Sequence, residues 1–485
     1  MPYTILHISD LHRSPKDPIS NEVLVSSLVS DFARSHQETP PINKPDAIVV
    51  SGDLIQGAPL FAPDHAASMS EQYEVALELL IELTDRFLHG DRTRLIVVPG
   101  NHDVDWNVAH AAMVPIADDD LPQNLRPSDF GPASTLRWNW KERKAYQISK
   151  EETYRERLDH FRRFVGRFYD GAALRYPLDP DADYGLFELN HGRIGVAALN
   201  SCHGNDCFAF HGSIADDALA QAHMDLYDRA TQYDLMMAVW HHNVDGPPGA
   251  SDYMDVSTVY TLIGRGFRLG LHGHQHRGQA TNRYIHLPKQ EPMAVVSAGS
   301  LCAGPSDLPT GVNRQYNIIE ISDDCAEVRV HVREMVVATV FAPARRAEFG
   351  GESFIDMKLG RPLPPILPER ARQDARIIES EKLLAAGEPR EALQVLQGIE
   401  VAPDSYARVL AIKAALAAEE WEKVTVLASP PSNIAELVVL AKSFVSLNRF
   451  ADAIAALDEH GPSLGFELAS QGDIRSYVAA KRSLA

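Results

Sequence analysis

The chain has 485 residues, of which 45% are hydrophobic, and its formal net charge at pH 7 is -20. This length and hydrophobic content predict a globular protein with two domains. The negative charge opposes non-specific binding to nucleic acid or to an anionic membrane, so a polyanion would have to be met by a local basic patch.

Short apolar runs rich in β-branched residues recur through the first 330 residues. They cover 3–9, 47–51, 95–98, 194–199, 235–240, 268–271 and 294–297. Such runs are typical of strands buried on both faces, and the segments 22–34 and 71–89 between them have the apolar spacing of helices. The alternation predicts an α/β fold, to which the segments 316–321 and 326–340 add antiparallel strands.

The pattern changes after residue 340. Residues 341–373 are rich in Pro, Gly and charge, and they are predicted to be a linker between a domain at 1–340 and a helical domain at 374–485. In the helical part, similar segments begin at Leu384, Leu416 and Val445. Their spacing resembles degenerate tetratricopeptide-type (TPR-like) helix pairs, whose period is about 34 residues; an unrelated helical bundle is the alternative.

The compartment is predicted from two further features. No stretch approaches the roughly 18 uninterrupted apolar residues of a membrane span, and the N-terminus enters a strand-like run, so we expect a cytoplasmic protein without a membrane partner. The four cysteines are too few and too scattered for a disulfide scaffold, and we expect packed, reduced thiols.

Acidic, histidine and asparagine residues follow five of the predicted strands. They are Asp10 and His12, then Asp53, then Asn101 with His102 and Asp103, then the pair His241 and His242, and last His274 with His276. The carboxyl ends of strands in an open α/β sheet are where ligands gather. Carboxylate, imidazole and amide groups together suit Mn, Fe or Zn better than Ca. A single Asp-x-His or Gly-Asp is usually structural, but the ordered set predicts a metal centre.

Two local features bear on this centre. Neighbouring residues on a strand point to opposite faces, so only one of His241 and His242 is expected to reach a metal. Glycines stand beside Asp53, Asn101 and His274, as expected where a turn needs a positive φ or the backbone approaches closely.

These five motifs, in this order, resemble the calcineurin-like metallophosphoesterase superfamily over residues 3 to about 330. The resemblance implies two packed mixed β-sheets flanked by helices. It assigns Asp10, His12 and His276 to one metal and Asn101, His241 and His274 to the other, with Asp53 as the bridge. It selects His241 because the family's usual ligand is the first histidine of such a pair. It also places His102 over the site as a catalytic group, with Asp103 fixing its tautomer.

The resemblance predicts a metal-dependent phosphoric ester hydrolase with two divalent ions, Mn first and Fe, Zn or Co as alternatives. Such a pair acidifies a bridging water, which loses a proton to give the hydroxide for in-line attack on phosphorus. The pair His241 and His242 precedes Asn243-Val-Asp245 and not the Pro-Pro of many phosphodiesterases, so no one subfamily is indicated.

An insertion at about 104–190 is the predicted substrate-facing cap. Within 137–175 basic residues outnumber acidic ones, and aromatic residues are threaded among them. This composition favours a phosphodiesterase or nuclease acting on a nucleotide or nucleic acid. It also fits a plain amphipathic helix over 151–169. A phosphomonoesterase is the alternative activity, and a scaffold that binds a protein partner or self-associates through the helical repeats is the alternative class of function.

Overall fold

The computed structural model describes residues 2–117, 121, 125, 127–227, 233–245, 252–284, 292–304, 307–337, 339–360, 368–399, 402 and 405–484. The chain forms two compact units. Unit 1 comprises Met1–Arg283 with Pro292–Pro364, and unit 2 comprises Tyr284–Glu291 with Pro365–Ala485. No helix among the described residues is long and apolar enough to span a membrane.

The first sheet of unit 1 is mixed. Its strands are β1 (Tyr3–Ile8), β2 (Ala47–Val50), β3 (Leu95–Val97), β13 (Gln315–Ile321), β14 (Glu327–Val337), β15 (Val340–Pro343) and β16 (Phe354–Lys358). Their order is β15-β14-β13-β1-β2-β3, and β16 also pairs with β14. The pairs β1–β2 and β2–β3 are parallel, whereas the pairs that involve β13 to β16 are antiparallel.

The second sheet of unit 1 is also mixed. Its strands are β7 (Tyr184–Leu189), β8 (Ile194–Leu199), β9 (Leu235–Val239), β10 (Leu269–His272), β11 (Gln279–Arg283) and β12 (Met293–Ser297). Their order is β11-β12-β10-β9-β8-β7, and the four central strands run parallel. Side chains from both sheets share one buried core, so the expected pair of packed mixed sheets is confirmed.

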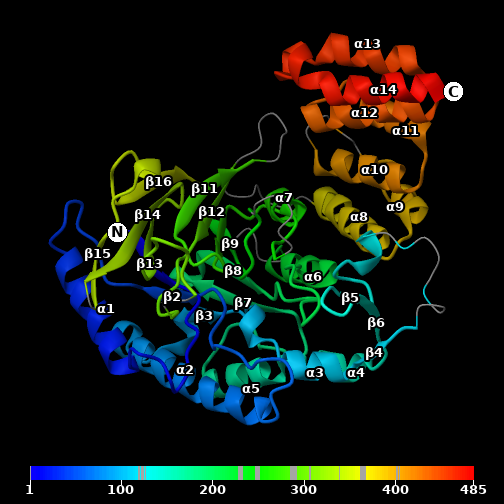
Figure 1. The fold of residues 1–485 in the computed structure, drawn as a ribbon. Helices are drawn as coiled ribbons and strands as arrows, with labels where there is room; N and C mark the ends of the chain where they lie inside the picture. Colours follow the sequence, from blue (N-terminus) through cyan, green and yellow to red (C-terminus); the bar gives the residue numbers. More distant parts are fainter. Residues whose placement is uncertain are drawn as a thin grey trace. The chain divides into compact units, whose positions relative to one another are not determined.

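Helices flank the two sheets (Figure 1). They include α1 (Asn21–Ser35), α2 (His65–Leu88), α6 (Asp216–Tyr227) and α7 (Val256–Gly264). The buried faces of α1 and α2 join the shared core, and α6 packs against β7 and β8. All four cysteines are free and buried, as expected.

The strand register brings the predicted site residues to one level. Ile8 pairs with Val50, and Val50 pairs with Val97, so β1, β2 and β3 end side by side. In the other sheet Val239 of β9 pairs with Leu271 of β10. The residues that follow these strand ends therefore meet at a common edge, as the parallel arrangement requires.

The insertion adds a small sheet and three helices. The elements are α3 (Trp106–Ala111), β4 (Met113–Pro115), β5 (Leu136–Asn139), β6 (Lys144–Ile148), α4 (Glu151–Arg155) and α5 (Asp159–Phe168). The rings of Phe164 and Phe168 are buried in the shared core. Arg137 is buried and donates from Nε to Asp206 at 2.5 Å. The two rings fit the amphipathic-helix interpretation of 151–169, and Arg137 is used inside the protein. Other basic side chains of the insertion, among them Lys144 and Arg163, are exposed, so a surface for nucleic acid stays a prediction.

The segment expected to be a linker, 341–373, differs from the prediction. It contains most of β15, all of β16 and the start of α8 (Pro368–Ala385). The β16 strand pairs with β14 from Glu327↔Lys358 to His331↔Phe354. The sequence hid this edge strand because it is short and lies among Gly, Pro and charged residues, and only Met357 of its five side chains is buried.

Unit 2 consists of helices. After α8 come α9 (Pro389–Val395), α10 (Tyr406–Ala417), α11 (Trp421–Leu427), α12 (Ile434–Ser446), α13 (Phe450–His460) and α14 (Gly472–Leu484). Short turns with a left-handed residue, at Gly387, Glu419 and Asn448, join α8 to α9, α10 to α11 and α12 to α13. The helical region is confirmed, and its likeness to tetratricopeptide repeats stays a prediction.

Each unit has a core of its own, which predicts that unit 1 folds without unit 2. The shared core of the sheets ends at Leu359, and the main helical core draws on residues from Leu383 onward. A protein truncated after Pro364 is expected to unfold in one cooperative thermal transition. Circular dichroism measures this transition, with full-length protein as the control. An insoluble product, or one without a transition, would contradict this independence.

Candidate metal centre

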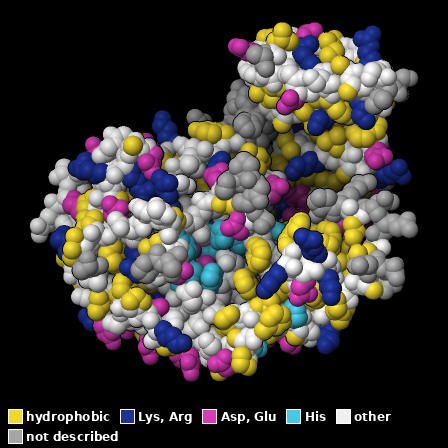
Figure 2. Space-filling model, in the orientation of Figure 1, with side chains coloured by type: hydrophobic (Ala, Val, Ile, Leu, Met, Phe, Trp, Pro, Cys, Tyr) yellow, Lys and Arg dark blue, Asp and Glu magenta, His cyan; other side chains and the backbone are white. Residues whose placement is uncertain are grey.

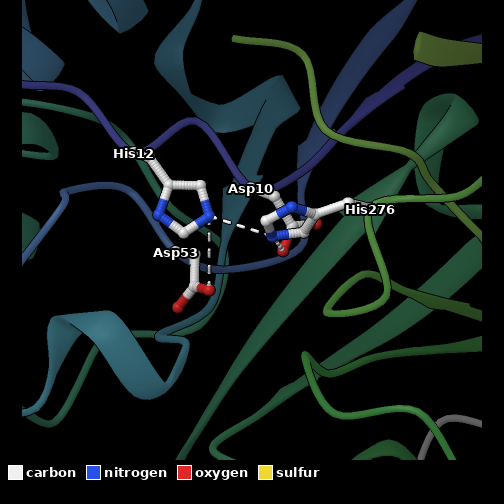
Figure 3. A group of neighbouring side chains, drawn as sticks. All are labelled: Asp10, His12, Asp53 and His276. Carbon is white, nitrogen blue, oxygen red and sulfur yellow. Dashed lines mark hydrogen bonds and ion pairs between the residues drawn. The ribbon is translucent and has the colours of Figure 1, made fainter. Parts of the chain in front are cut away.

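Four of the predicted residues form one compact group in unit 1 (Figure 3). Asp10, His12, Asp53 and His276 each offer a ligand atom, and these atoms all lie within 4.8 Å of one another. The Nε2 atoms of His12 and His276 are 3.1 Å apart, and His276 Nε2 is 3.3 Å from Asp10 Oδ1. Two imidazole nitrogens and two carboxylates that converge in this way are a donor set for a divalent transition metal.

A second group lies on the other side of Asp53. His241 Nε2 is 3.1 Å from Asn101 Oδ1 and 3.3 Å from His274 Nδ1. His274 Nδ1 is also 3.1 Å from Asn101 Oδ1. These three residues were predicted to hold one metal, and the fold brings them together from the ends of β3, β9 and β10.

Asp53 connects the two groups. Its Oδ2 lies 3.8 Å from His12 Nε2 in the first group and 3.3 Å from His241 Nε2 in the second. Its Oδ1 accepts a hydrogen bond from the backbone N of His102 at 2.8 Å, which fixes the carboxylate in place. The arrangement therefore fits two cations that share one carboxylate ligand.

Backbone carbonyls orient two of the histidines. His241 Nδ1 is 2.8 Å from Ser51 O, and His276 Nδ1 is 2.6 Å from Asp307 O. A carbonyl only accepts hydrogen bonds, so each Nδ1 donates its proton to the carbonyl and each ring turns its Nε2 toward the groups, where a cation would take the place of a second proton. Sequence reasoning did not identify either carbonyl, because any residue type can supply one.

The electrostatics of the groups favour positive charge. Burial by itself lowers the pKa of His241, but the Asp53 carboxylate outweighs burial and raises that pKa to about 9. In the same way, burial lowers the pKa of His276, but the Asp10 carboxylate outweighs burial and raises that pKa to about 9. Burial tends to raise the pKa of Asp53, yet the neighbouring His241 and His102 rings hold it well below its usual range. The carboxylates thus stabilise positive charge where cations would bind.

His102 lies beside the first group. Its ring centroid is 4.6 Å from that of His12, and its Nδ1 is 2.8 Å from Gln56 O. Because the carbonyl can only accept, Nδ1 carries the proton and Nε2 is left to act on a substrate. Gln56 is therefore the residue that orients His102, and sequence reasoning missed it because the contact is made by the backbone.

Asp103 has a different partner from the predicted one. Its Oδ2 accepts from the backbone N of Gly100 at 2.8 Å and of Leu54 at 3.2 Å, and its Oδ1 accepts from the Tyr73 hydroxyl at 2.8 Å. Burial, together with the Asp53 carboxylate, raises the pKa of Asp103 to about 7. The expectation that Asp103 fixes the His102 tautomer is corrected, because these contacts use Asp103 to tie two motif loops together.

His241 and His242 have different surroundings in the structure. His241 faces Asp53 and Asn101, whereas His242 Nδ1 lies 2.9 Å from the hydroxyl of Ser201. Burial lowers the pKa of His242 well below its usual range. The geometry therefore favours His241 as the ligand of the pair, and His242 is a buried neutral ring behind it.

Asp252 is a further acidic residue near the second group. Its Oδ2 lies 3.7 Å from His274 Nε2, and its side chain is half exposed. It belongs to the loop between β9 and α7, where a single Asp carries no motif that sequence reasoning could have identified.

A comparison with models of protein families identifies the family of the chain. A family model for calcineurin-like phosphoesterases matches residues 3–278, more than half of the chain. The chain belongs to this family. Membership implies a hydrolase that acts on phosphoesters, and members typically use two divalent metals. A search of curated proteins gave no match.

Several solved structures are similar to the chain. A dimetal phosphatase from Danio rerio is 11% identical, with a TM-score of 0.39, over 74% of this chain and 100% of that one. A putative 5′-nucleotidase from Staphylococcus aureus is 11% identical, with a TM-score of 0.31, over 78% of this chain and 58% of that one. The calcineurin-like phosphoesterase YfkN from Bacillus subtilis is 11% identical, with a TM-score of 0.29, over 79% of this chain and 98% of that one.

Gly52 provides a test of how tightly the second group is packed. Its φ is +96°, and a Cβ at this position would lie 2.5 Å from His241 Nδ1. Gly52→Ala is therefore expected to displace the ring and to weaken Mn²⁺ binding about 10- to 100-fold, as measured by equilibrium dialysis.

Gly171→Ala is the matched control, because Gly171 also has a positive φ of +74° but no atom within 4 Å of its Cβ position. It carries the same kind of backbone strain without the clash. Equal Mn²⁺ binding by the two variants would show that the contact with His241 is unimportant.

Proposed function

We propose that the chain is a two-metal phosphodiesterase that hydrolyses a nucleotide or nucleic-acid diester. The observation that carries the proposal is the position of Asp53, whose Oδ2 faces a histidine nitrogen of each group. Asp10, His12 and His276 would hold one cation, and Asn101, His241 and His274 the other. When bound, the two cations would supply an acidified water as the nucleophile and would stabilise charge on the phosphoryl oxygens.

His102 is the proposed acid and stabiliser of the transition state. Its proton on Nδ1 is fixed by Gln56 O, so the Nε2 side is the one that can donate to a leaving oxygen once that nitrogen is protonated. The backbone N of the same residue binds Asp53 Oδ1, which ties the position of this ring to the bridging carboxylate. Asp103 acts on the reaction only through the loops that it joins.

Charge supports a diester over a monoester. A phosphate monoester carries a charge of about -1.5 to -2 at neutral pH, which usually calls for basic side chains in addition to metal ions. In the described ranges no Lys or Arg side chain forms a hydrogen bond or ion pair with the seven proposed ligands, and the acidic Asp252 lies next to His274. The Asp252 carboxylate would repel a doubly charged monoester more strongly than a singly charged diester.

The test of the proposed function is hydrolysis with Mn²⁺ added. Bis-p-nitrophenyl phosphate, p-nitrophenyl phosphate, cyclic nucleotides, and single-stranded and duplex DNA are compared, with Asp53→Ala as the control. Diester cleavage that is lost in the variant is the expected result. Cleavage of the monoester alone would favour a phosphomonoesterase, and no cleavage of any substrate would favour a scaffold that acts through the helices of unit 2.

The division of roles between Asp53 and His102 predicts different losses. Asp53→Ala is expected to abolish both metal retention and turnover, because both groups lose a ligand. His102→Ala is expected to keep its metal and to lower kcat by about 10²- to 10⁴-fold, the usual contribution of a general acid. Metal analysis after dialysis, together with initial rates, checks both. Equal metal loss in the two variants would rule out this division.

A further inference from the structure

Three aromatic side chains of unit 1 are strongly exposed among the described residues. They are Phe61, Trp140 and Phe210, with exposed fractions of 69%, 81% and 41%. Phe61 and Phe210 belong to loops that contact site residues, whereas Trp140 follows β5 in the insertion. In Figure 2 hydrophobic side chains gather on the surface beside a hollow that contains histidines.

The loop that carries Phe61 is firmly held. Gln56 O binds His102 Nδ1, and the backbone N of Gly57 donates to Gln72 Oε1 at 2.9 Å. Asn107 then accepts from the backbone N of Phe61 at 2.6 Å and donates to Pro59 O at 3.1 Å. The hydrogen bonds thus hold the backbone of this loop in a conformation that exposes the Phe61 ring to solvent.

The loop that carries Phe210 is held in a similar way. Cys202 and Ser213 close the loop through a parallel bridge, and Phe210 O accepts from Asn205 Nδ2 at 3.0 Å. Gly212 packs so closely on His242 that a Cβ there would lie 2.8 Å from its Nδ1. The ring of His242 is in turn 4.8 Å from that of His274, so this loop borders the second group.

One helix joins the two exposed rings. Trp106 and His110 of α3 are four residues apart and therefore lie on the same helix face, about 6 Å apart along the axis. The Phe210 ring is 5.7 Å from Trp106, and the Phe61 ring is 5.0 Å from His110. The two rings therefore border one aromatic strip, which begins four residues after His102.

The strip is within reach of the site. Gly57 lies against His102 O, and Phe61 follows it by four residues, a span of at most roughly 14 Å. Phe210 precedes Gly212, which touches His242, by only two residues. An ester whose phosphorus lies at the proposed ligands could place a ring on this strip when a sugar separates the two.

We propose that Phe61 and Phe210 form a stacking site for a planar aromatic group of the phosphoester, namely a nucleobase. This inference rests on the proposed function, because the phosphoryl group must be held at the metal centre. Aromatic faces stack with any base, so the site would select nucleotides over sugar phosphates without selecting among bases.

The test measures binding and does not depend on turnover. Equilibrium dialysis of Mn²⁺-loaded full-length protein compares phosphinate isosteres of methyl adenosine 5′-phosphate and methyl ribose 5-phosphate, in which carbon replaces both ester oxygens. These compounds cannot be hydrolysed, carry the single negative charge of a diester and differ only in the base. The parent protein is expected to bind the adenosine compound at least about tenfold more tightly. Phe61→Ala and Phe210→Ala are each expected to weaken its binding about 10- to 100-fold and to leave binding of the ribose compound within about twofold.

Matched variants make the outcome specific. Phe61→Trp is expected to restore tight binding of the adenosine compound. Trp140→Ala, which removes the third exposed ring, is expected to leave the affinity for both ligands unchanged. Equal binding of both ligands by the parent protein, or equal weakening of both by the Phe variants, would overturn the stacking site. A protein that cleaves no diester but passes this test would refute only the proposed activity.

Discussion

The buried carboxylate of Asp53 is the interaction on which the site depends. One oxygen is held by the backbone of His102, and the other faces His12 and His241, which come from different sheets. A buried carboxylate is costly unless opposite charges and hydrogen bonds surround it. The imidazoles supply that compensation in the protein alone, and cations would supply it more fully. The two sheets therefore have to meet with their strand ends at the same level.

The local backbone is adapted to this convergence. Asp10, His12, Asp53, His274 and His276 all have positive φ values, between 44° and 78°. Each such conformation costs on the order of 1–3 kcal/mol in a residue other than glycine, and strain of this kind persists only where the surrounding structure holds it. Here the shared core of both sheets fixes the strands on either side. The strained turns then direct several polar side chains from adjacent positions into the same small volume.

The insertion serves the fold more than its composition suggested. Its basic and aromatic residues indicated a surface for nucleic acid, but Arg137 and Arg157 bind partners inside the protein, and the rings of α5 fill the core. Composition alone does not distinguish these roles, because an arginine beside a buried carboxylate and one beside a phosphate look alike in sequence. The exposed rings of Phe61 and Phe210 come instead from the loop after β2 and the loop after β8. Both loops lie outside the insertion.

The sequence by itself determined most strands of both sheets, though not β7, β11 or β16, together with the two main helices before β3 and the order of the site motifs. These features depend on short-range patterns of apolar and polar residues, which a single sequence displays directly. Only the tertiary structure decided that His241 and not His242 faces Asp53, that Gln56 and not Asp103 orients His102, and that β16 belongs to the sheet. Each of these outcomes depends on contacts between residues far apart in the chain, such as Gln56 and His102, which are 46 positions apart. No local pattern encodes which backbone carbonyl or which sheet edge such a contact will use.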